Sequence, residues 1–430
     1  MNNGPDTDTV GRPPSERRPT DWKAAAVQRR TRRRYAAERR FRLIGLAAVW
    51  LSAGFLALLL ASMLTQGIGG FRQTRIALPI DLAREHLPVT GDQVRGRGAD
   101  LALAGAGLEN AVDHAATAAY GAEAPDWLSD GAWLVVRDAV KRDPSLLRRP
   151  ATIDVPVTSA IDIAARRDGP AAAEAVVARL QARGVLSVGW NLGFLTSSDS
   201  TDPTRVGIWG ALKGSLLTMM VTLLLAFPVG VFAALYLEEY APRNRWTDII
   251  EVSINNLAAV PSIIFGLLGL AVFLNTMHLP RSAPIVGGLT LALMTMPVIV
   301  IAGRNAIKAV PPSIRDAALA VGASPVQVVF DHVLPLALPG ILTGTIIGMA
   351  RALGETAPLL MIGMRAFIAA PPSRLADPAT VLPVQIFLWS DQVDRGFVEK
   401  TSAAIIVLLV FLLAMNGLAI YLRNRFETRW

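Results

Sequence analysis

Residues 310–325 read VPPSIRDAALAVGASP. Ser313 can cap a helix, and Asp316 comes three residues later, where a carboxylate can face the free N–H groups of the first turn. We expect a short helix over Asp316–Val321, which Gly322 ends in the left-handed conformation. Ser324-Pro325 then favours the start of a second helix. The segment is predicted to be a helix–turn–helix whose small-residue surface another protein can approach closely.

Long apolar segments surround this loop. Of the 430 residues, 52% are hydrophobic and 18% charged, which is too apolar for an ordinary soluble protein of this length. Most of the uncharged segments exceed the roughly 20 residues that a helix needs to cross a bilayer. The fifth is interrupted by Arg351 and Glu355 and continues to Met364. We predict six spanning helices, in the segments 43–70, 214–237, 252–280, 282–303, 336–364 and 401–422.

The first apolar segment follows a basic tail. Twelve Lys or Arg lie between Arg12 and Arg42, which indicates either a nucleic-acid arm or a cytoplasmic anchor under the positive-inside rule. Because a spanning segment follows at once, we expect the anchor. A secretory signal peptide would have a shorter apolar region. Six crossings then place Arg423, Arg425 and Arg429 in the cytoplasm as well.

This topology places a large insertion outside the cytoplasm. Residues 72–206 carry 15 Lys or Arg against 17 Asp or Glu and contain no spanning segment. We expect a small extracytoplasmic domain with a strand at Ala151–Val157 and an amphipathic helix over Pro170–Arg183. Trp190–Thr196 precedes the second spanning helix and is a candidate for the membrane interface. The predicted organisation is a basic cytoplasmic tail (1–42), a first transmembrane helix (43–71), this domain (72–206), a core with five helices (207–425) containing the loop 310–335, and a basic cytoplasmic end (423–430).

Several kinds of chemistry are excluded by composition. There is no cysteine, so no disulfide, thiolate metal site or Cys nucleophile exists. The four histidines, His86, His114, His278 and His332, lack ligand spacing. No G-x-x-x-x-G-K-[ST] loop occurs, so we expect no ATP or other cofactor to be bound by this chain.

Prolines 228, 261 and 297 lie inside predicted spans, as do Asn255 and Asn256. Neighbouring groups must satisfy the backbone groups that such prolines free. They indicate either helix packing or a solvated pathway lined by broken helices.

The fifth apolar segment carries the candidate pathway residues. Gly340, Gly344 and Gly348 form a small-residue stripe that lets helices pack closely. Arg351 falls near the middle of the predicted span, where a guanidinium costs on the order of 3 kcal/mol and should face the bundle interior. Glu355 is spaced for an i,i+4 ion pair with it. The pair is either a structural lock or an oxyanion site in which Arg351 exchanges partners, since the guanidinium fork suits phosphate.

The loop at 310–335 resembles a known coupling motif. Asp316-Ala317-Ala318, Gly322 and the later Leu334-Pro335 are similar to the EAA motif of type I ABC importer permeases. Asp replaces the first Glu of that motif, and His332 stands where Ile is usual. The resemblance implies an all-α polytopic membrane protein with six transmembrane helices and a MetI-like core. It also implies that the loop docks into an ATPase subunit, so that ATP hydrolysis belongs to a partner and this chain is not an enzyme.

Two further stretches of sequence point to one group within this family. Residues 350–360, ARALGETAPLL, and 227–240, FPVGVFAALYLEEY, resemble PstA-type phosphate permeases, and the likeness covers roughly 205–425. In that family an Arg and Glu of the R-x-x-G-E-T-A-P stretch are linked to phosphate passage, which implies Arg351 and Glu355 here. Members often carry another Arg after the P-x-V-I run. This chain has Ile301 and Ala302 there, and Arg304 either substitutes one turn later or is only a positive-inside anchor.

The resemblance implies a set of partners in the bacterial inner membrane. They are a homologous PstC-type permease subunit, a PstB-type ATPase dimer, an extracytoplasmic PstS-type phosphate-binding protein and membrane lipid, with no nucleic acid. The open alternatives are an importer of sulfate, molybdate or phosphonate, a membrane sensor, and a secondary transporter. A sensor would need an output module, for which the short tail after Leu422 leaves no room. A secondary transporter should show a repeated half, which is not found.

Overall fold

The computed structural model describes residues 25–426 except 86, 97, 168 and 366. The expectations on the tail before residue 25, on His86 and on Arg429 therefore lie outside the described residues. The chain divides into two compact units, 1–62 and 63–430. Helix α1 (Ala25–Gly70) contributes to both units. In the first unit, the basic part of α1 continues directly into its apolar part, whose side chains are exposed.

The second unit contains an α/β domain at 72–206, here called the inserted domain. Its antiparallel sheet has the order β2-β1-β3, so β1 (Arg72–Ile80) lies between β2 (Ala151–Pro156) and β3 (Leu186–Trp190). Leu78 pairs with Ile153 on one side of β1, and Thr74 pairs with Val188 on the other. The helices are α2 (Gly91–Arg95), α3 (Ala99–Gly105), α4 (Leu108–Tyr120), α5 (Ala132–Arg142), α6 (Ser159–Ala164), α7 (Ala171–Ala182) and α8 (Leu192–Thr196), with 3₁₀ turns η1 (Pro125–Trp127) and η2 (Pro144–Leu147).

The core of the inserted domain is built on β1. Ile76, Leu78 and Ile80 alternate along the strand and are buried, as period-two patterning requires. They belong to one apolar cluster with Val112 of α4 and Val136 of α5. The sequence predicted β2 and α7 at nearly these bounds. It did not predict β1, the strand that organises the sheet.

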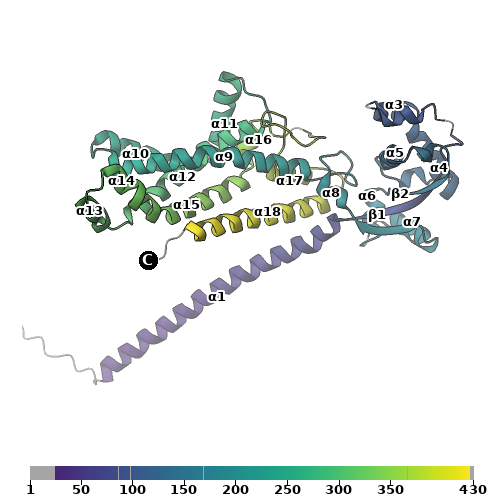
Figure 1. Cartoon of the computed structure of the whole chain (residues 1–430). Coiled ribbons are helices and arrows are strands. Elements are labelled where there is room, and N and C mark those ends of the chain that lie inside the picture. Colours follow the sequence, from purple (N-terminus) through teal and green to yellow (C-terminus); the bar gives the residue numbers. More distant parts are fainter. Residues whose placement is uncertain (1–24, 86, 97, 168, 366, 427–430) are drawn as a thin grey trace, which may run out of the picture. The chain divides into compact units, whose positions relative to one another are not determined.

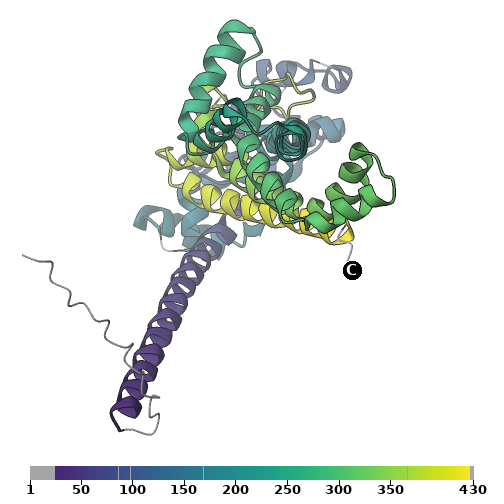
Figure 2. The same cartoon turned by 90° about the vertical axis from the view of Figure 1, so that its left-hand side faces the viewer.

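The rest of the second unit is helical. Figures 1 and 2 show α9, α12, α15 and α18 packed alongside one another. Glycines allow the close approach: a Cβ on Gly230 of α9 would lie 2.8 Å from Cγ2 of Ile299 in α12. The elements are α9 (Trp209–Leu235), η3 (Tyr236–Tyr240), α10 (Arg245–Ala258), α11 (Ser262–Gly269), η4 (Leu270–Thr276), α12 (Pro284–Lys308), α13 (Pro312–Ala320), α14 (Pro325–Gln327), η5 (Val328–Val333), α15 (Leu334–Gly354), α16 (Ala357–Met361), α17 (Leu382–Ser390) and α18 (Gly396–Phe426), where η3, η4 and η5 are π-helical turns.

Five helices within the described residues are long and apolar enough to cross a membrane, and a sixth crossing is possible through a bent pair. The chain is thus a multi-pass membrane protein, as predicted, and the inserted domain adds a sheet to the predicted helices. Two expectations on individual helices are corrected. The third predicted span bends by 101° between Arg245–Ala258 and Ser262–Thr276, where Pro261 removes a backbone donor. The fifth ends at Gly354 and does not continue as one helix to Met364.

The three prolines inside the predicted spans behave differently. Pro228 and Pro297 lie within the unbroken helices α9 and α12. Pro261 instead stands between α10 and α11, at the bend. A proline in an apolar segment therefore does not by itself locate a break, because packing against neighbours can hold the helix together.

Candidate functional site: the helix 13 loop and the end of helix 15

The loop after α12 forms the predicted helix–turn–helix. Helix α13 begins at Pro312 and ends at Ala320, and Gly322 has φ +92°, as its predicted role in ending the helix requires. Ser324 caps α14 by accepting a hydrogen bond from the Gln327 N–H. The predicted cap at Ser313 is wrong, because α13 begins before it with Pro311 at the cap position. Proline at the first helical turn needs no donor there and is well tolerated.

The surface of this loop is partly apolar. Asp316, Ala317 and Gly322 are exposed, whereas Ala318 is buried against the helical core. Sequence reasoning did not single out Leu319 and Val321, which are 49% and 84% exposed beside them. Apolar side chains of this size, exposed beside small residues, are typical of a protein-docking surface.

Arg315, which sequence reasoning also missed, ties α13 to the membrane helices. Its Nη2 donates to Oε1 of Glu239 at 2.7 Å and to the Ile307 carbonyl at 3.1 Å, and its Nη1 donates to the Val310 carbonyl at 2.7 Å. Glu239 lies in η3, directly after α9. The guanidinium therefore joins the loop to the ends of α9 and α12. The sequence shows an Arg next to the motif and two adjacent acids at 238–239. It does not indicate that they meet, because Arg315 and Glu239 are 76 positions apart.

Arg304 belongs to a neighbouring network. Its Nη2 donates to Oε2 of Glu251 at 2.8 Å, and its Nε donates to Oε2 of Glu238 at 3.3 Å. Nζ of Lys308 lies 3.6 Å from the same Glu238 oxygen. Two carboxylates therefore pair with this guanidinium, and the Arg304 side chain is only 12% exposed. The charge of Arg304 is thus balanced within the protein.

Arg351 and Glu355 lie at the end of α15. Nε of Arg351 is 3.6 Å from Oε1 of Glu355, in the expected i,i+4 relation. The prediction that Arg351 lies near the middle of the span is wrong, because α15 ends at Gly354 and Arg351 occupies its last turn. A cation there interacts favourably with the helix C-terminus, and Glu355 is the first residue beyond it. The Arg351 side chain is 49% exposed on this chain. The geometry brings these two together but leaves Arg304 in its separate ion-pair network.

The glycine stripe of α15 lies against α12. A Cβ on Gly340 would be 2.6 Å from Cβ of Ala306, and one on Gly344 would be 2.1 Å from Cβ of Ala302. For Gly348 the contact is Cγ2 of Thr295, at 2.9 Å. Real Cβ atoms do not approach so closely, so glycine at these positions is what allows α15 to pack this closely against α12. The same packing positions Arg351 at the end of α15.

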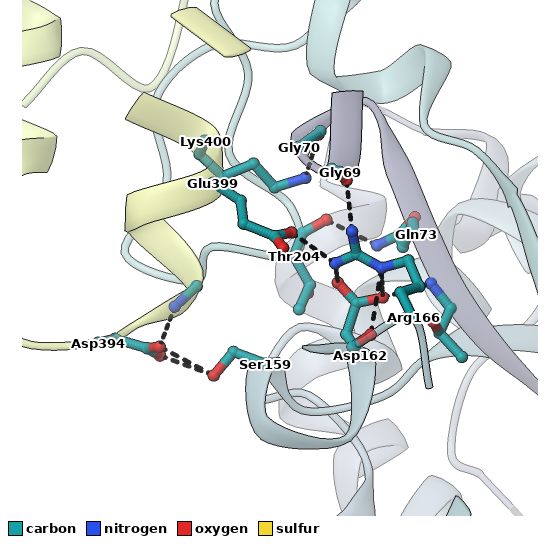
Figure 3. Close-up of polar contacts among 12 residues, drawn as sticks. Gly69, Gly70, Gln73, Ser159, Asp162, Arg166, Thr204, Asp394, Glu399 and Lys400 are labelled. Carbon is teal, nitrogen blue, oxygen red and sulfur yellow. Dashed lines mark hydrogen bonds and ion pairs between the residues drawn. The ribbon is translucent and has the colours of Figure 1, made fainter. Parts of the chain in front are cut away.

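A buried charged cluster joins the inserted domain to α18 (Figure 3). Nη2 of Arg166 lies 2.7 Å from Oδ2 of Asp162 and 2.7 Å from Oε2 of Glu399, and its Nη1 donates to the Gly69 carbonyl at 2.6 Å. Lys400 donates to the Gly70 carbonyl at 2.7 Å. The cluster thus connects α6, the last residues of α1 and the first turn of α18.

Comparison with known proteins covers both parts of the chain. A family model described as "Binding-protein-dependent transport system inner membrane component" matches residues 226–428, and one described as "Domain of unknown function (DUF3333)" matches residues 28–175. The first match contains α13, α15 and α18. The second contains most of α1 and much of the inserted domain.

Individual relatives match about a third to a half of the chain. The probable ABC transporter permease protein YqgI of Bacillus subtilis is 32% identical over 242 residues, 52% of this chain and 82% of the relative. The phosphate transport system permease protein PstA of Haemophilus influenzae is 31% identical, over 53% of this chain and 79% of the relative. PstA 1 of Mycobacterium tuberculosis is 36% identical over 156 residues, which are 36% of this chain and 50% of the relative. Among solved structures, the MetNI methionine ABC transporter in inward-facing conformations is similar at 18% identity and a TM-score of 0.42, covering 51% of this chain and 98% of that chain.

Proposed function

Because the chain belongs to the family of binding-protein-dependent transport system inner membrane components, the permeases of ABC importers, we propose that the substrate it translocates is inorganic phosphate. The observation that carries this proposal is the half-exposed Arg351 guanidinium, 3.6 Å from Glu355 at the end of α15. Relatives named as phosphate permeases, at 31–36% identity, support it.

Arg351 suits a permeating oxyanion for physical reasons. Its planar fork of N–H donors matches the oxygens of phosphate. At 3.6 Å the contact with Glu355 is longer than a close charge-assisted hydrogen bond. Phosphate would replace Glu355 as the partner during passage, and Glu355 would neutralise the guanidinium between cycles. Neither step changes a covalent bond in this chain.

In this proposal α13 transmits the work of ATP. An ATPase dimer would dock on the surface formed by Ala317, Leu319 and Val321, and ATP binding would close it. Since a ligand shifts an equilibrium only through differential contacts, the loop must fit the closed dimer better than the open one. Arg315, through Glu239, would pass that displacement to α9, so that the helices alternate between inward-open and outward-open states.

Arg304 has a different role in this proposal. Glu238 and Glu251 hold it, so it would anchor the cytoplasmic ends of α9, α10 and α12 and not contact substrate. The termini would be cytoplasmic and the inserted domain extracytoplasmic. A homologous permease subunit would complete the pathway, and a phosphate-binding protein would deliver the substrate.

Uptake of labelled phosphate tests the choice of substrate. A strain lacking this gene, complemented by the wild-type chain or by Arg351→Lys, is assayed with sulfate or molybdate as competitor. We expect phosphate uptake that neither competitor suppresses, and reduced uptake with Lys, which keeps the charge but loses the fork. Loss of sulfate or molybdate uptake in the deletion strain, with phosphate uptake intact, would assign another oxyanion.

A further inference from the structure

The short helix α8 is hydrogen-bonded to residues at the end of one apolar helix, α1, and at the start of another, α9. The Asn191 N–H, just before it, donates to the carbonyl of Phe71, the residue that follows α1, at 2.8 Å. At its other end, the Ile208 and Trp209 N–H groups donate to the carbonyls of Phe194 and Ser197, at 2.8 and 3.0 Å. Trp209 is the first residue of α9. The end of α1 and the start of α9 both bound apolar segments that are long enough to span a membrane, so these hydrogen bonds hold α8 beside the ends of both segments.

This segment has one buried face and one exposed apolar face. Phe194 is fully buried, with its ring 5.4 Å from that of Phe71 and 6.2 Å from that of Trp389. Leu192 is 70% exposed, Leu195 42% and Trp190, at the end of the edge strand β3, 64%. An apolar group of this kind would be costly in water, whereas Trp and Leu side chains are favoured at the level where the aqueous phase meets a bilayer.

A cation accompanies these apolar side chains. The guanidinium carbon of Arg72 lies 5.5 Å from the centroid of the Trp190 ring, within range of a cation–π interaction. Within residues 25–426, apart from the four undescribed positions, no carboxylate pairs with Arg72. Its N–H donors are therefore available to an anion on the exposed side of the Trp190 ring.

We propose that Trp190, Leu192 and Leu195 insert into the lipid headgroup region, and that Arg72 binds the phosphate of a phospholipid there. These four residues are called the interfacial anchor. Aromatic rings favour this level of a bilayer, and amphipathic segments bury their apolar side chains about 5–10 Å into it. The anchor would hold the edge of the β-sheet against the membrane, so that the inserted domain keeps a fixed distance and tilt. This inference needs only the multi-pass fold and is independent of the transported substrate.

Lipid is favoured over a partner protein by the position of α8. Phospholipid headgroups are present at the depth of the outer rim of α9 around every spanning helix. The combination of Trp, Leu and an unpaired Arg also matches a phospholipid, whose acyl chains can contact the apolar side chains while its phosphate binds the guanidinium.

The natural absence of cysteine makes the test direct. Leu192→Cys and Leu195→Cys are each labelled with bimane in the full chain, purified with its associated subunits and placed in vesicles of phosphatidylethanolamine and phosphatidylglycerol whose acyl chains are brominated near the headgroup. The matched control is Leu101→Cys, in α3 of the same domain, where the leucine is 81% exposed. We expect loss of most of the bimane fluorescence at 192 and 195 and little loss at 101. Equal quenching at all three sites, or a probe at 192 protected from both bromine and a water-soluble quencher, as a covering protein subunit would cause, would overturn the anchor.

A second substitution tests the phosphate contact. In the Leu192→Cys background, Arg72→Gln should reduce the quenching, because the cation that holds the segment to the headgroups is lost. Arg75→Gln, on the opposite face of the same strand, where Arg75 donates to Gln73, should leave it unchanged. Quenching that stays at the wild-type level in Arg72→Gln, or falls equally in both variants, would contradict a phosphate site at Arg72.

Discussion

Removal of the guanidinium from the buried cluster of Figure 3 should loosen the inserted domain from α18. The Arg166 side chain is 8% exposed, and the carboxylates of Asp162 and Glu399 are 9% and 11% exposed. Arg166→Met keeps most of the apolar stem but removes the ion-pair partner of two buried carboxylates and leaves Lys400, whose ammonium donates to the Gly70 carbonyl, as the cation beside them. Such a loss costs about 3–5 kcal/mol, because uncompensated charge remains out of water.

The cost can be measured as a change in thermal stability. For a domain of this size each kcal/mol corresponds to about 3 °C, so we expect the apparent Tm of the purified protein to fall by roughly 10 °C. Limited proteolysis should cut the inserted domain sooner. The control is Arg149→Met, whose pair with Asp143 is 60% and 45% exposed and should contribute only about 0–1 kcal/mol.

A compensating variant separates charge from packing. Adding Glu399→Gln to Arg166→Met removes one of the orphaned charges and should restore part of the lost stability, since Gln can still hydrogen-bond within the cluster. An unchanged Tm in Arg166→Met would show that the cluster contributes nothing to holding the domain. A double variant less stable than the single one would show that packing, and not charge, dominates.

Three other substitutions test separate parts of the molecule. Arg351→Ala should abolish uptake while the subunits still co-purify; normal uptake would leave the residue a packing role only. Gly322→Val forces a β-branched residue to φ +92°, at a cost of roughly 1–2 kcal/mol, and should weaken capture of the ATPase partner in a pull-down, whereas capture at the wild-type level would contradict docking at this turn. Gly344→Leu should destabilise the bundle by about 1–3 kcal/mol or more through overpacking against α12, measured as a lower Tm; an unchanged Tm would mean that the helices separate easily.

The pH dependence of stability gives a further test. Burial raises the pKa of Asp199, which accepts a hydrogen bond from the Trp389 indole at 3.0 Å. The native state therefore binds the proton more tightly than the unfolded chain does, and this contribution to stability is lost as pH rises from 3.8 through the native pKa. Asp199→Asn keeps an acceptor for Trp389 and should flatten the decline in Tm over that range. A decline identical to wild type would place its origin in another group.

Much of the candidate site could be predicted from local sequence. The spacing of Arg351 and Glu355 on one helix face, and the left-handed conformation of Gly322, follow from contacts within a few residues. So does the glycine stripe, since positions four apart must share a face. The Ser313 cap failed because a competing local signal, Pro311-Pro312, set the start of α13 instead.

The sequence alone determined which apolar segments are long enough to span a membrane, because the length of an uncharged apolar segment decides whether a helix can cross a bilayer. It could not determine which charges meet. Arg315 pairs with Glu239, 76 positions away, and Arg304 pairs with Glu238 and Glu251. Arg166 pairs with Glu399, which comes after most of the membrane helices in the sequence. Ion pairs carry no periodicity along the chain, and a buried charge accepts whichever opposite charge the packed helices bring within reach. Tertiary packing alone therefore decided these pairs, and with them how the inserted domain is joined to the permease.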